Sequence, residues 1–519
     1  MTLIMKGIAS LKQIVIKNVL QYLELSKTRF SQKEAFSDET ETKTYAQMLS
    51  DSKRIGSALS VHISPRKPVA IMMKKSCQTL AAFFGTVYAG CFYVYFNPDL
   101  PHGRLKSIKE VLHANCVITD QENKHLAKEL FNKKEDKCFQ IDELLCGNIQ
   151  EDVINEIRHS MVDTDPLYVN FTSGSTGVPK GVIINHRSVI DFINVFTQTF
   201  SISEKDVIAN QAPFDFDVSV KDIYSTLCAG AKLVIVPKFL FSQPVQLMDF
   251  LCDNRITTMI WAVSALCLIT TFHALDYRVP HNVHKVLFSG EVMPAKHLRQ
   301  WMEKLPQACF VNLYGPTEIT CNCTYHCISA QDDLNCLPIG KAFDNERVLL
   351  LDTENRLVEQ KDIIGEICVV GTALSPGYMN APEQTQKVFT QNPLNTQYPE
   401  MIYKTGDLGY YDEQNNLHFC GRKDFQIKYK GHRIELEEIE KSIQEIDGIV
   451  RACCVFDEKR SKLYAFYIGT PERGQLYQTL KQQLPEFMVP GAFRKVNELP
   501  ITKNGKIDRK ALKEEVVKP

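Results

Sequence analysis

The pattern of apolar and polar positions changes character along the chain. From about residue 30 to residue 330, short strand-like runs alternate with longer helix-like segments. In the clearest run, Leu167, Val169 and Phe171 alternate with Tyr168 and Asn170, a period of two that is typical of a strand. This alternation of elements favours helices packed on largely parallel sheets.

Beyond this region the pattern predicts two further units. Short strands and turns dominate residues 337–421, which indicates a β-rich subdomain. After it, Leu436, Ile439, Ile443 and Ile446 recur at spacings of three and four, which is typical of a helix. Two strands and a helix should follow, at 449–456, 463–468 and 476–484. The chain therefore ends in a compact α+β unit.

One uncharged stretch, residues 79–96, raises the question of a membrane span. Its length is near the lower limit of roughly 17–25 residues for a spanning helix. Its composition changes midway, because 80–89 suits a buried helix and 91–96 suits a strand that ends at Asn97–Pro98. We therefore expect a buried helix–strand unit and no membrane span.

Composition narrows the class of protein. With 519 residues, 44% hydrophobic and 23% charged, the chain can bury more than one core. A formal net charge of −1 argues against a nucleic-acid or anionic-membrane partner. Lys6, Lys12 and Lys17 interrupt the N-terminal apolar stretch, so no secretory signal is expected. The seventeen cysteines form no regular framework, which favours reduced thiols in a cytoplasmic protein. Cys321, Cys323 and Cys327 do not match a zinc pattern.

The segment FTSGSTGVPKG, residues 171–181, directly follows the clearest strand. Glycines let a backbone approach phosphate closely, while hydroxyls, amides and a lysine bind its oxygens and charge. The candidate phosphate-binding residues are Thr172, Ser173, Gly174, Ser175, Thr176, Gly177 and Lys180. The standard P-loop needs GxxxxGK[ST], whereas here a glycine follows Lys180. A Gly/Ser linker is the alternative, but the preceding strand and the Pro-Lys-Gly exit argue against it.

This loop resembles the phosphate loop of the adenylate-forming superfamily, which includes acyl-CoA synthetases, luciferases and nonribosomal-peptide adenylation domains. Further segments match that family in its own order, from about residue 30 onward. They are AGCFYVYFNPDLP at 89–101, NLYGPTE at 312–318, GEICVVGTALSPGY at 365–378, YKTGDL at 403–408, GRKDFQIKYKGHRIELEEIE at 421–440, LPEFMVP from residue 484 and NGKIDR at 504–509.

The resemblance implies an α/β fold with two domains. The large N-terminal domain, residues 1–421, would hold two helix-flanked, mostly parallel sheets and the β-rich, barrel-like subdomain at about 337–421. The small α+β C-terminal domain, residues 422–519, would be mobile. Its hinge would lie at the aspartate of the GRxD motif, which is Asp424 here.

The resemblance also assigns the nucleotide site, with ATP as substrate, AMP as product and Mg²⁺ bound to the phosphates. A cation aimed at the charge that develops on phosphorus is the strongest single contribution to such a reaction. Lys506 would bridge the substrate carboxylate and the phosphate, and Glu318 would hold Mg²⁺. The remaining implied roles are Thr317 at the α-phosphate, Tyr314 stacked on adenine, Asp407 and Arg422 at the ribose, and Asn312 and Gly315 in the same nucleotide site.

An aspartate suggests which acid is activated. Phe216, Asp217 and Ser219 match the FDxS segment in which amino-acid-activating members pair an aspartate with the α-ammonium. A buried aspartate without a partner would be costly, so it favours a cationic substrate group over a turn residue. This segment, FSGEVMP at 288–294 and DFQIK at 424–428 look most similar to D-alanine–carrier protein ligases.

The side-chain pocket implied by the resemblance leaves the substrate open. It would consist of Asp217, Val218, Lys221, Ile260, Leu287, Ser289, Leu313, Cys321 and Asn322. Leu313 replaces a small residue and favours a shallow pocket for D-alanine or another small amino acid. Lys221 and Ser289 replace a methionine and a cysteine, and an inward lysine would favour an acidic or amide side chain. Alternatively, Lys221 snorkels to solvent and alanine-like specificity persists. Pro376 stands where many members have arginine, so no role is assigned there.

We expect the thiol acceptor to be a phosphopantetheinyl carrier protein supplied in trans, because no LGGxS-type serine follows Arg509. The predicted protein is thus an ATP-dependent amino acid–carrier protein ligase. The enzyme alternative is an acyl-CoA synthetase. A third hypothesis, a catalytically silent nucleotide-binding homologue, is disfavoured because Lys506, Glu318 and Asp407 are all present.

Overall fold

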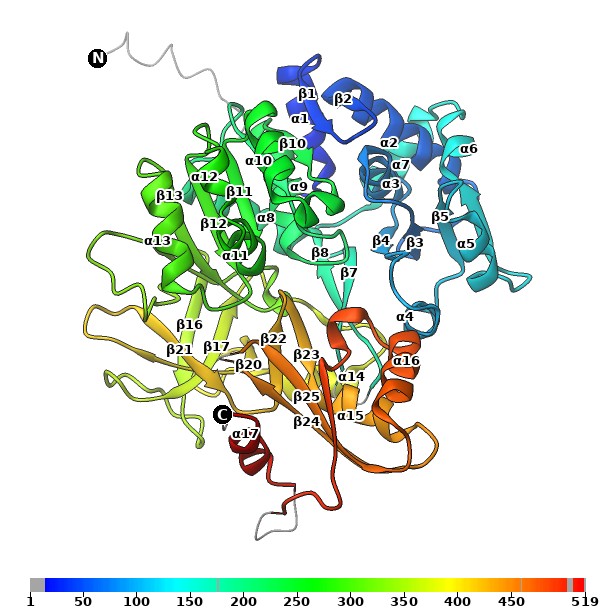
Figure 1. Cartoon of the computed structure of the whole chain (residues 1–519). Helices are drawn as coiled ribbons and strands as arrows, with labels where there is room; N and C mark the ends of the chain where they lie inside the picture. The colour runs from blue at the N-terminus through cyan, green and yellow to red at the C-terminus, as the bar shows by residue number, and fades with distance from the viewer. Residues whose placement is uncertain (1–14, 175–176, 459, 502–506, 518–519) are drawn as a thin grey trace, which may run out of the picture.

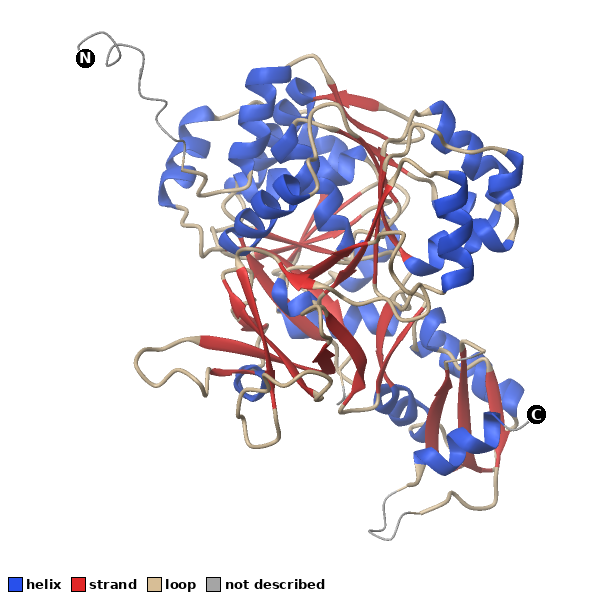
Figure 2. Cartoon of the chain, turned by 90° about the vertical axis from the view of Figure 1, so that its left-hand side faces the viewer, coloured by secondary structure: helices blue, strands red, loops and turns tan. Residues whose placement is uncertain are grey.

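The computed structural model describes residues 15–174, 177–458, 460–501 and 507–517. Three predicted site residues, Ser175, Thr176 and Lys506, lie outside these ranges. The chain forms a large lobe and a smaller C-terminal lobe (Figure 1), and helices cover the outer faces of the large lobe's sheets (Figure 2). This mixed α/β architecture confirms the predicted fold class.

The first sheet of the large lobe has the strand order β15-β14-β13-β12-β11-β9-β10-β1-β2. The strands from β13 to β1 run parallel, and antiparallel strands close both edges. Its members are β1 (Glu34–Ser37), β2 (Thr42–Thr44), β9 (Val207–Asn210), β10 (Lys232–Ile235), β11 (Thr258–Ala262), β12 (Lys285–Ser289), β13 (Cys309–Tyr314), β14 (Thr324–Cys327) and β15 (Lys341–Ala342).

The second sheet has the order β18-β8-β7-β4-β3-β5-β6 and is parallel from β7 to β6. Strands β7 and β8 form an antiparallel pair, in which Thr172 lies opposite Lys180. The members are β3 (Pro68–Met72), β4 (Phe92–Tyr95), β5 (Cys116–Thr119), β6 (Lys137–Gln140), β7 (Pro166–Thr172), β8 (Lys180–Asn185) and β18 (Gly377–Tyr378). The predicted phosphate loop thus connects two hydrogen-bonded strands.

Both sheets bury both faces. In β11, Ile260 faces the core shared by the two sheets, whereas Met259 and Trp261 face a separate core on the outer side. This alternation explains why such strands are almost wholly apolar. The helices of this lobe are α1 (Leu20–Phe30), α2 (Tyr45–Ser60), α3 (Cys77–Tyr88), α4 (His102–Leu112), α5 (Lys124–Leu130), α6 (Ile141–Leu145), α7 (Glu151–Ser160), α8 (His186–Thr199), α9 (Val218–Ala229), α10 (Pro244–Asp253), α11 (Val263–Thr271), α12 (Ala274–Tyr277) and α13 (Ala295–Lys304), with short turns η1 (Lys238–Ser242) and η2 (Thr317–Ile319).

The β-rich region forms a third, antiparallel sheet. Its elements are β16 (Glu346–Leu351), β17 (Gly365–Gly371), α14 (Pro382–Val388), β19 (Phe389–Gln391), β20 (Met401–Tyr411) and β21 (Leu417–Arg422). Asp407 of β20 lies opposite Arg422 of β21. The pairing brings together the two side chains that were assigned to the ribose.

The C-terminal lobe contains a hairpin and a three-stranded sheet whose two faces are both covered. Lys430 (φ 51°) and Gly431 (φ 80°) form the hairpin turn, with the positive φ values that a two-residue hairpin loop requires. Alternate residues of β24 face opposite cores, with Cys454 toward α15 and α16 and Cys453 toward α17. The elements are β22 (Gln426–Tyr429), β23 (His432–Glu435), α15 (Leu436–Gln444), β24 (Ile449–Asp457), β25 (Lys462–Gly469), α16 (Arg473–Gln483), η3 (Glu486–Met488), β26 (Ala492–Lys495) and α17 (Arg509–Val517).

Several local predictions are confirmed. The uncharged stretch 79–96 divides into α3 and β4, and the periodic residues from Leu436 to Ile443 lie in α15. Helix α1 was not predicted. No helix in the described chain is long and apolar enough to cross a membrane. All seventeen cysteines fall within the described ranges, and each is a free thiol.

Candidate active site

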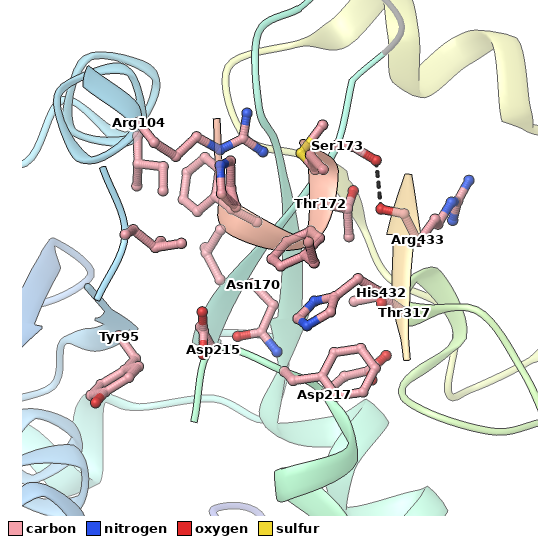
Figure 3. A pocket seen from close by; sticks show the side chains of 18 residues that line it. Tyr95, Arg104, Asn170, Thr172, Ser173, Asp215, Asp217, Thr317, His432 and Arg433 are labelled. Atoms are coloured by element: carbon pink, nitrogen blue, oxygen red, sulfur yellow. Dashed lines mark hydrogen bonds between the residues drawn. The ribbon is translucent and has the colours of Figure 1, made fainter. Parts of the chain in front are cut away.

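A cavity between the two lobes collects many of the predicted residues (Figure 3). Its lining includes residues of α4, η3 and the phosphate loop, and the residue that precedes α9. The lining residues are Tyr95, Leu100, Arg104 and Ile108; Val169 to Ser173; Asp215 to Asp217; Thr317; His432 and Arg433; and Pro485, Phe487 and Met488. Asp217, Thr317 and the phosphate loop therefore share one cavity.

Glycines allow the phosphate loop its tight path. A Cβ on Gly174 would lie 2.0 Å from the carbonyl oxygen of Val178, so only glycine fits. Gly177 adopts φ +78°, a left-handed conformation that other residues rarely adopt. The spacing of glycines in this segment is thus required by its backbone.

Donors of this loop already make hydrogen bonds or an ion pair with acceptors of the C-terminal lobe. Ser173 Oγ donates to the carbonyl oxygen of Arg433 at 2.7 Å and accepts from the Glu435 amide at 3.2 Å. The Gly174 amide donates to Glu438 Oε2 at 3.1 Å, and Lys180 Nζ lies 3.4 Å from Glu435 Oε1. Two glutamates therefore contact groups that the sequence assigned to ATP phosphates.

Glu318, the predicted Mg²⁺ ligand, is fully buried and paired with an arginine. Arg433 Nη1 lies 2.8 and 3.0 Å from its two carboxylate oxygens, and the Tyr378 hydroxyl donates to it at 2.8 Å. Burial alone would raise the pKa of Glu318, but Arg433 and Tyr378 outweigh it and hold the pKa below its ordinary value. An ionised carboxylate suits Mg²⁺, which needs few protein ligands beside phosphate oxygens. Arg433 would have to withdraw before the ion could bind.

Further contacts fix the C-terminal lobe in this position. Arg104 of α4 pairs with Glu438 of α15, and both side chains are almost fully buried. At the tip of the β22–β23 hairpin, the Gly431 amide donates to Glu291 Oε1 at 2.7 Å. Within the C-terminal lobe, His432 stacks on Phe487 with ring centroids 3.6 Å apart, and its ring centroid lies 5.7 Å from that of Phe216 in the large lobe. The hairpin therefore forms one wall of the cavity.

The residues assigned to adenine and ribose also cluster. The Tyr314 hydroxyl donates to Asp407 Oδ2 at 2.5 Å, and Arg422 pairs with the other oxygen of Asp407. Lys428 Nζ lies 5.2 Å from the centre of the Tyr314 ring. Arg422 also holds Asp424, the predicted hinge residue, through bonds of 2.6 and 2.7 Å. The hinge candidate is thus linked to the ribose end of the site.

Asn312 and Gly315 each hold β13 against a neighbouring backbone segment. The Asn312 amide donates to the carbonyl oxygen of Pro338 at 2.9 Å. A Cβ on Gly315 would lie 2.4 Å from Asn322 Cα, so glycine allows β13 to approach the segment carrying Asn322. Both residues therefore position neighbouring segments in this structure.

Asp217 lies at the N-terminal end of α9 without serving as its cap. Its side chain makes no capping hydrogen bond to that helix and is only 7% exposed. Burial raises the pKa of this carboxyl, while the Thr317 hydroxyl and the charge of Lys221 oppose the rise. A carboxylate placed in this way can receive a cationic group that enters the cavity.

Apart from Asp217, the residues of the predicted side-chain pocket do not line the cavity. Each of these eight residues is at most 6% exposed. Those eight are Val218, Lys221, Ile260, Leu287, Ser289, Leu313, Cys321 and Asn322. Ile260 and Leu287 are adjacent in the parallel sheet, at the middle of β11 and β12.

The possibility that Lys221 snorkels to solvent is wrong. Its side chain is fully buried, and Nζ donates to Asn322 Oδ1 at 2.6 Å and more weakly to Ser289 Oγ at 3.5 Å. Helix α9 buries every residue from 218 to 227, so no path to water is open to this side chain. Burial lowers the pKa of Lys221.

An unusual backbone segment presents Asn322 to Lys221. Thr320 and Cys321 adopt φ values of 55° and 81°, which are uncommon for non-glycine residues. The Thr320 hydroxyl donates to the carbonyl oxygen of Ala373 at 2.7 Å, and Cys321 Sγ lies 3.1 Å from the carbonyl oxygen of Asp217. Such conformations persist where the surroundings enforce them, and they are common at functional sites.

Sequence reasoning missed several residues of the site. Arg433, Glu435 and Glu438 lie in GHRIELEEIE, which was identified as a motif but given no individual roles. His432 and Arg104 were missed as well. The sequence did contain a signal for these residues. GHRIELEEIE carries a run of charges at the start of a predicted helix whose other residues are typical of a buried segment.

Comparisons with known proteins agree with this geometry. Residues 23–379 match the model of the AMP-binding enzyme family, and residues 438–506 match that of the AMP-binding enzyme C-terminal domain. Zwittermicin A synthase ZmaJ of Bacillus cereus is 34% identical over 91% of this chain and 90% of its own. The D-alanine–D-alanyl carrier protein ligase of Bacillus mycoides is 31% identical over 91% and 94%.

Among solved structures, the Vibrio cholerae adenylation domain AlmE, in complex with glycyl-adenosine-5'-phosphate, shares the fold. Its TM-score is 0.84, with 21% identity over 97% of this chain and 98% of that one. The resemblance and the enzyme class predicted from the motifs are confirmed. This chain belongs to the AMP-binding enzyme family and is an AMP-forming, adenylate-forming ligase.

Proposed function

We propose that the protein activates an amino acid with ATP and then transfers it to the phosphopantetheine thiol of a carrier protein. The observation that carries this proposal is the position of Asp217. Its carboxylate faces the cavity that also holds Thr317 and the phosphate loop, and the adjacent helix does not use it as a cap. A substrate α-ammonium at Asp217 would direct its own carboxylate toward the phosphates.

In the first step, a carboxylate oxygen of the amino acid bonds to the α-phosphorus of ATP. The bond from that phosphorus to the oxygen bridging to the β-phosphate breaks, and pyrophosphate leaves. The proposed roles are Asp217 for the α-ammonium, Thr317 for the α-phosphate, the loop at 172–180 for the leaving phosphates, and Tyr314, Asp407 and Arg422 for the nucleoside. Glu318 would hold Mg²⁺, which neutralises phosphate charge when bound. Lys506 would stabilise the charge developing on phosphorus.

In the second step, the thiol sulfur bonds to the acyl carbon while the acyl–phosphate oxygen bond breaks. AMP leaves, and the thiol proton passes to solvent. We propose that the acceptor arm enters the cavity past Arg104 and Phe487, which line it from the two lobes. Because Arg433 occupies Glu318 here, we assign this arrangement to the second step and propose Asp424 as the pivot between the two. A D-alanine or other small amino acid is the favoured substrate, and the free thiols agree with a cytoplasmic protein.

Pyrophosphate exchange tests the proposal directly. Purified protein is given ATP, Mg²⁺, labelled pyrophosphate and each proteinogenic amino acid or D-alanine, with fatty and aryl acids as the comparison. Exchange with an amino acid, followed by formation of a thioester on a phosphopantetheinylated carrier protein, is the expected result. Exchange with fatty or aryl acids alone would instead identify an acyl-CoA synthetase.

A further inference from the structure

We infer that Cys336, His418 and Asp412 form a reactive thiol site that exchanges with disulfides of low-molecular-weight thiols. The product is a mixed disulfide on Cys336. The three residues come from the loop between β14 and β15 and from the β20–β21 hairpin, and they do not line the cavity described above. The inference therefore goes beyond the proposed function and does not depend on it.

The first support is the contact between the thiol and an imidazole. Cys336 is exposed, and its Sγ lies 3.7 Å from His418 Nδ1. His418 belongs to β21, and its side chain is only 12% exposed. A thiol within hydrogen-bond reach of a base, with the base oriented by a third group, is the arrangement that activates a cysteine as a nucleophile.

A carboxylate supplies the third group. His418 Nε2 lies 3.0 Å from Asp412 Oδ2. Burial alone would raise the pKa of Asp412, but hydrogen bonds from the Asn416 backbone and from His418 outweigh it and hold the pKa below its ordinary value. An ionised carboxylate can only accept, so Nε2 carries the ring proton. Nδ1 therefore presents its lone pair to the Cys336 thiol.

The surrounding structure fixes the three groups in line. Tyr410 stacks on the His418 ring, with centroids 5.0 Å apart and an interplanar angle of 8°. The loop that carries the thiol is tied to the same strand, because the Ile339 and Gly340 amides donate to the carbonyl oxygen of Leu417 at 2.8 and 3.1 Å. Both the ring and the loop are thus held by β20 and β21.

Disulfide exchange is the reaction that this arrangement supports best. The Cys336 sulfur bonds to one sulfur of the disulfide as the S–S bond breaks, and the electron pair of that bond leaves with the other sulfur. The thiol proton passes to His418 Nδ1 and then to the departing thiolate, which is released as a thiol. Acyl transfer would also need donors for the oxyanion of a tetrahedral intermediate, whereas disulfide exchange forms no oxyanion.

A purely structural role makes a different prediction. Asp412 Oδ1 also accepts two backbone amides of the β20–β21 turn, at 2.9 and 2.8 Å. If His418 and Asp412 only stabilised this hairpin, Cys336 would react like other exposed thiols. Cys146 is the internal reference, because it is exposed as well and, within the described chain, no hydrogen bond joins it to an imidazole.

The experiment treats the full chain with bis(2-hydroxyethyl) disulfide and follows each cysteine by peptide mass spectrometry. We expect Cys336 to be modified on the order of 10²-fold faster than Cys146. His418→Gln should remove most of this advantage. His326→Gln is the matched control, since His326 also pairs with a carboxylate, 3.1 Å from Asp332 Oδ2, and its side chain is 13% exposed. It should leave the rate at Cys336 unchanged.

Asp412 acts through the imidazole and is a positioning residue. Asp412→Asn should slow the modification of Cys336 to a similar extent, because an amide can donate to Nε2 and leave Nδ1 protonated toward the thiol. Nitrogen NMR of the labelled His418 ring should show this change of tautomer, which a merely structural role would not produce. Asp412→Asn also serves if His418→Gln does not fold. Imidazole added to His418→Gly should restore part of the rate.

Three results would overturn the inference. One is a rate at Cys336 no higher than that at Cys146. Another is an unchanged rate at Cys336 in His418→Gln. The third is an equal loss of rate in His326→Gln, which would mean that any change near this loop slows the reaction. None of these measurements uses ATP or an amino acid, so failure of the proposed function would leave the test intact.

Discussion

The phosphate end and the side-chain end of the candidate site differ in where their charges come from. At the phosphate end, the C-terminal lobe supplies Arg433 and Glu438, which bind Glu318 and the Gly174 amide of the large lobe. At the side-chain end, Lys221 and its partners all belong to the large lobe, and those partners are neutral.

This difference suggests how each end meets its ligand. A group already paired within the chain must be released before it can bind ATP or Mg²⁺, so the phosphate end depends on movement of the C-terminal lobe. A buried lysine with neutral partners needs no such release. The contacts of the phosphate end therefore depend on the position of the C-terminal lobe, whereas those of Lys221 do not.

The largest expected effect comes from Lys506→Ala. Loss of one charge-stabilising donor should lower adenylation by roughly 10²–10³-fold, about 2.7–4 kcal/mol. ATP binding should change less, because the phosphate loop and Tyr314 remain. Pyrophosphate exchange and equilibrium ATP binding measure the two effects. Exchange near the wild-type rate would show that the phosphate end does not need this lysine.

Asp217→Asn should come next and should affect the amino acid rather than ATP. The amide keeps the shape of the carboxylate but loses the charge for the α-ammonium. We expect kcat/KM for the amino acid to fall about 10²-fold, with KM for ATP little changed. Steady-state exchange at varied concentrations of each substrate separates these effects. Equal changes for both substrates would place Asp217 outside the amino acid site.

The pH dependence of stability tests the packing around His432, which lies between Phe487 of its own lobe and Phe216 of the large lobe. Burial, together with the charge of Lys430, lowers the pKa of His432 to about 4, below the ordinary value of about 6.5. The folded protein therefore binds fewer protons than the unfolded chain between these values, and stability should fall as pH drops from 6.5 toward 4.

His432→Phe keeps a flat ring beside Phe487 but cannot titrate. Between pH 6.5 and 4.5, the free energy of unfolding should decrease in both proteins, but by about 2 kcal/mol less in the variant than in the wild type. Urea denaturation across this range measures the difference. Parallel curves for the two proteins would mean that His432 is protonated equally in the folded and unfolded states.

The smallest expected effect is that of Glu438→Gln. This change weakens the pair with Arg104 and the bond from the Gly174 amide, both of which hold the lobe over the phosphate loop. The apparent KM for ATP should fall by several-fold, and carrier loading should fall by about the same factor, because the second-step arrangement is less stable.

Glu437→Gln is its control. That neighbour points instead toward Arg509, with an N–O distance of 3.4 Å, and its side chain is 34% exposed. It should leave both measurements near wild type. A rise in KM for ATP in Glu438→Gln would contradict the competition between this glutamate and the phosphates.

Local patterns were enough to predict the layout of the chain. The alternating residues of β7 and the threefold and fourfold spacing in α15 depend only on the period of the element, which a short window contains. The tight path of the loop at residues 171–181 could also be predicted, because the left-handed turn at Gly177 and the close approach at Gly174 require glycine. Helix α1 was missed, since its buried face includes Ser26 and lacks a clear apolar repeat.

The sequence by itself determined the family and the division of the chain into a helix-flanked parallel region, a β-rich region and an α+β C-terminal unit. Only the tertiary structure decided the partners of Glu318 and Gly174, which lie 115 and 264 positions from Arg433 and Glu438 in the sequence. It also decided the direction of Lys221. Helix α9 is buried on every side, so its sequence carries no polar face to show where a lysine would point. Contacts between distant segments fix such features, and no local period encodes them.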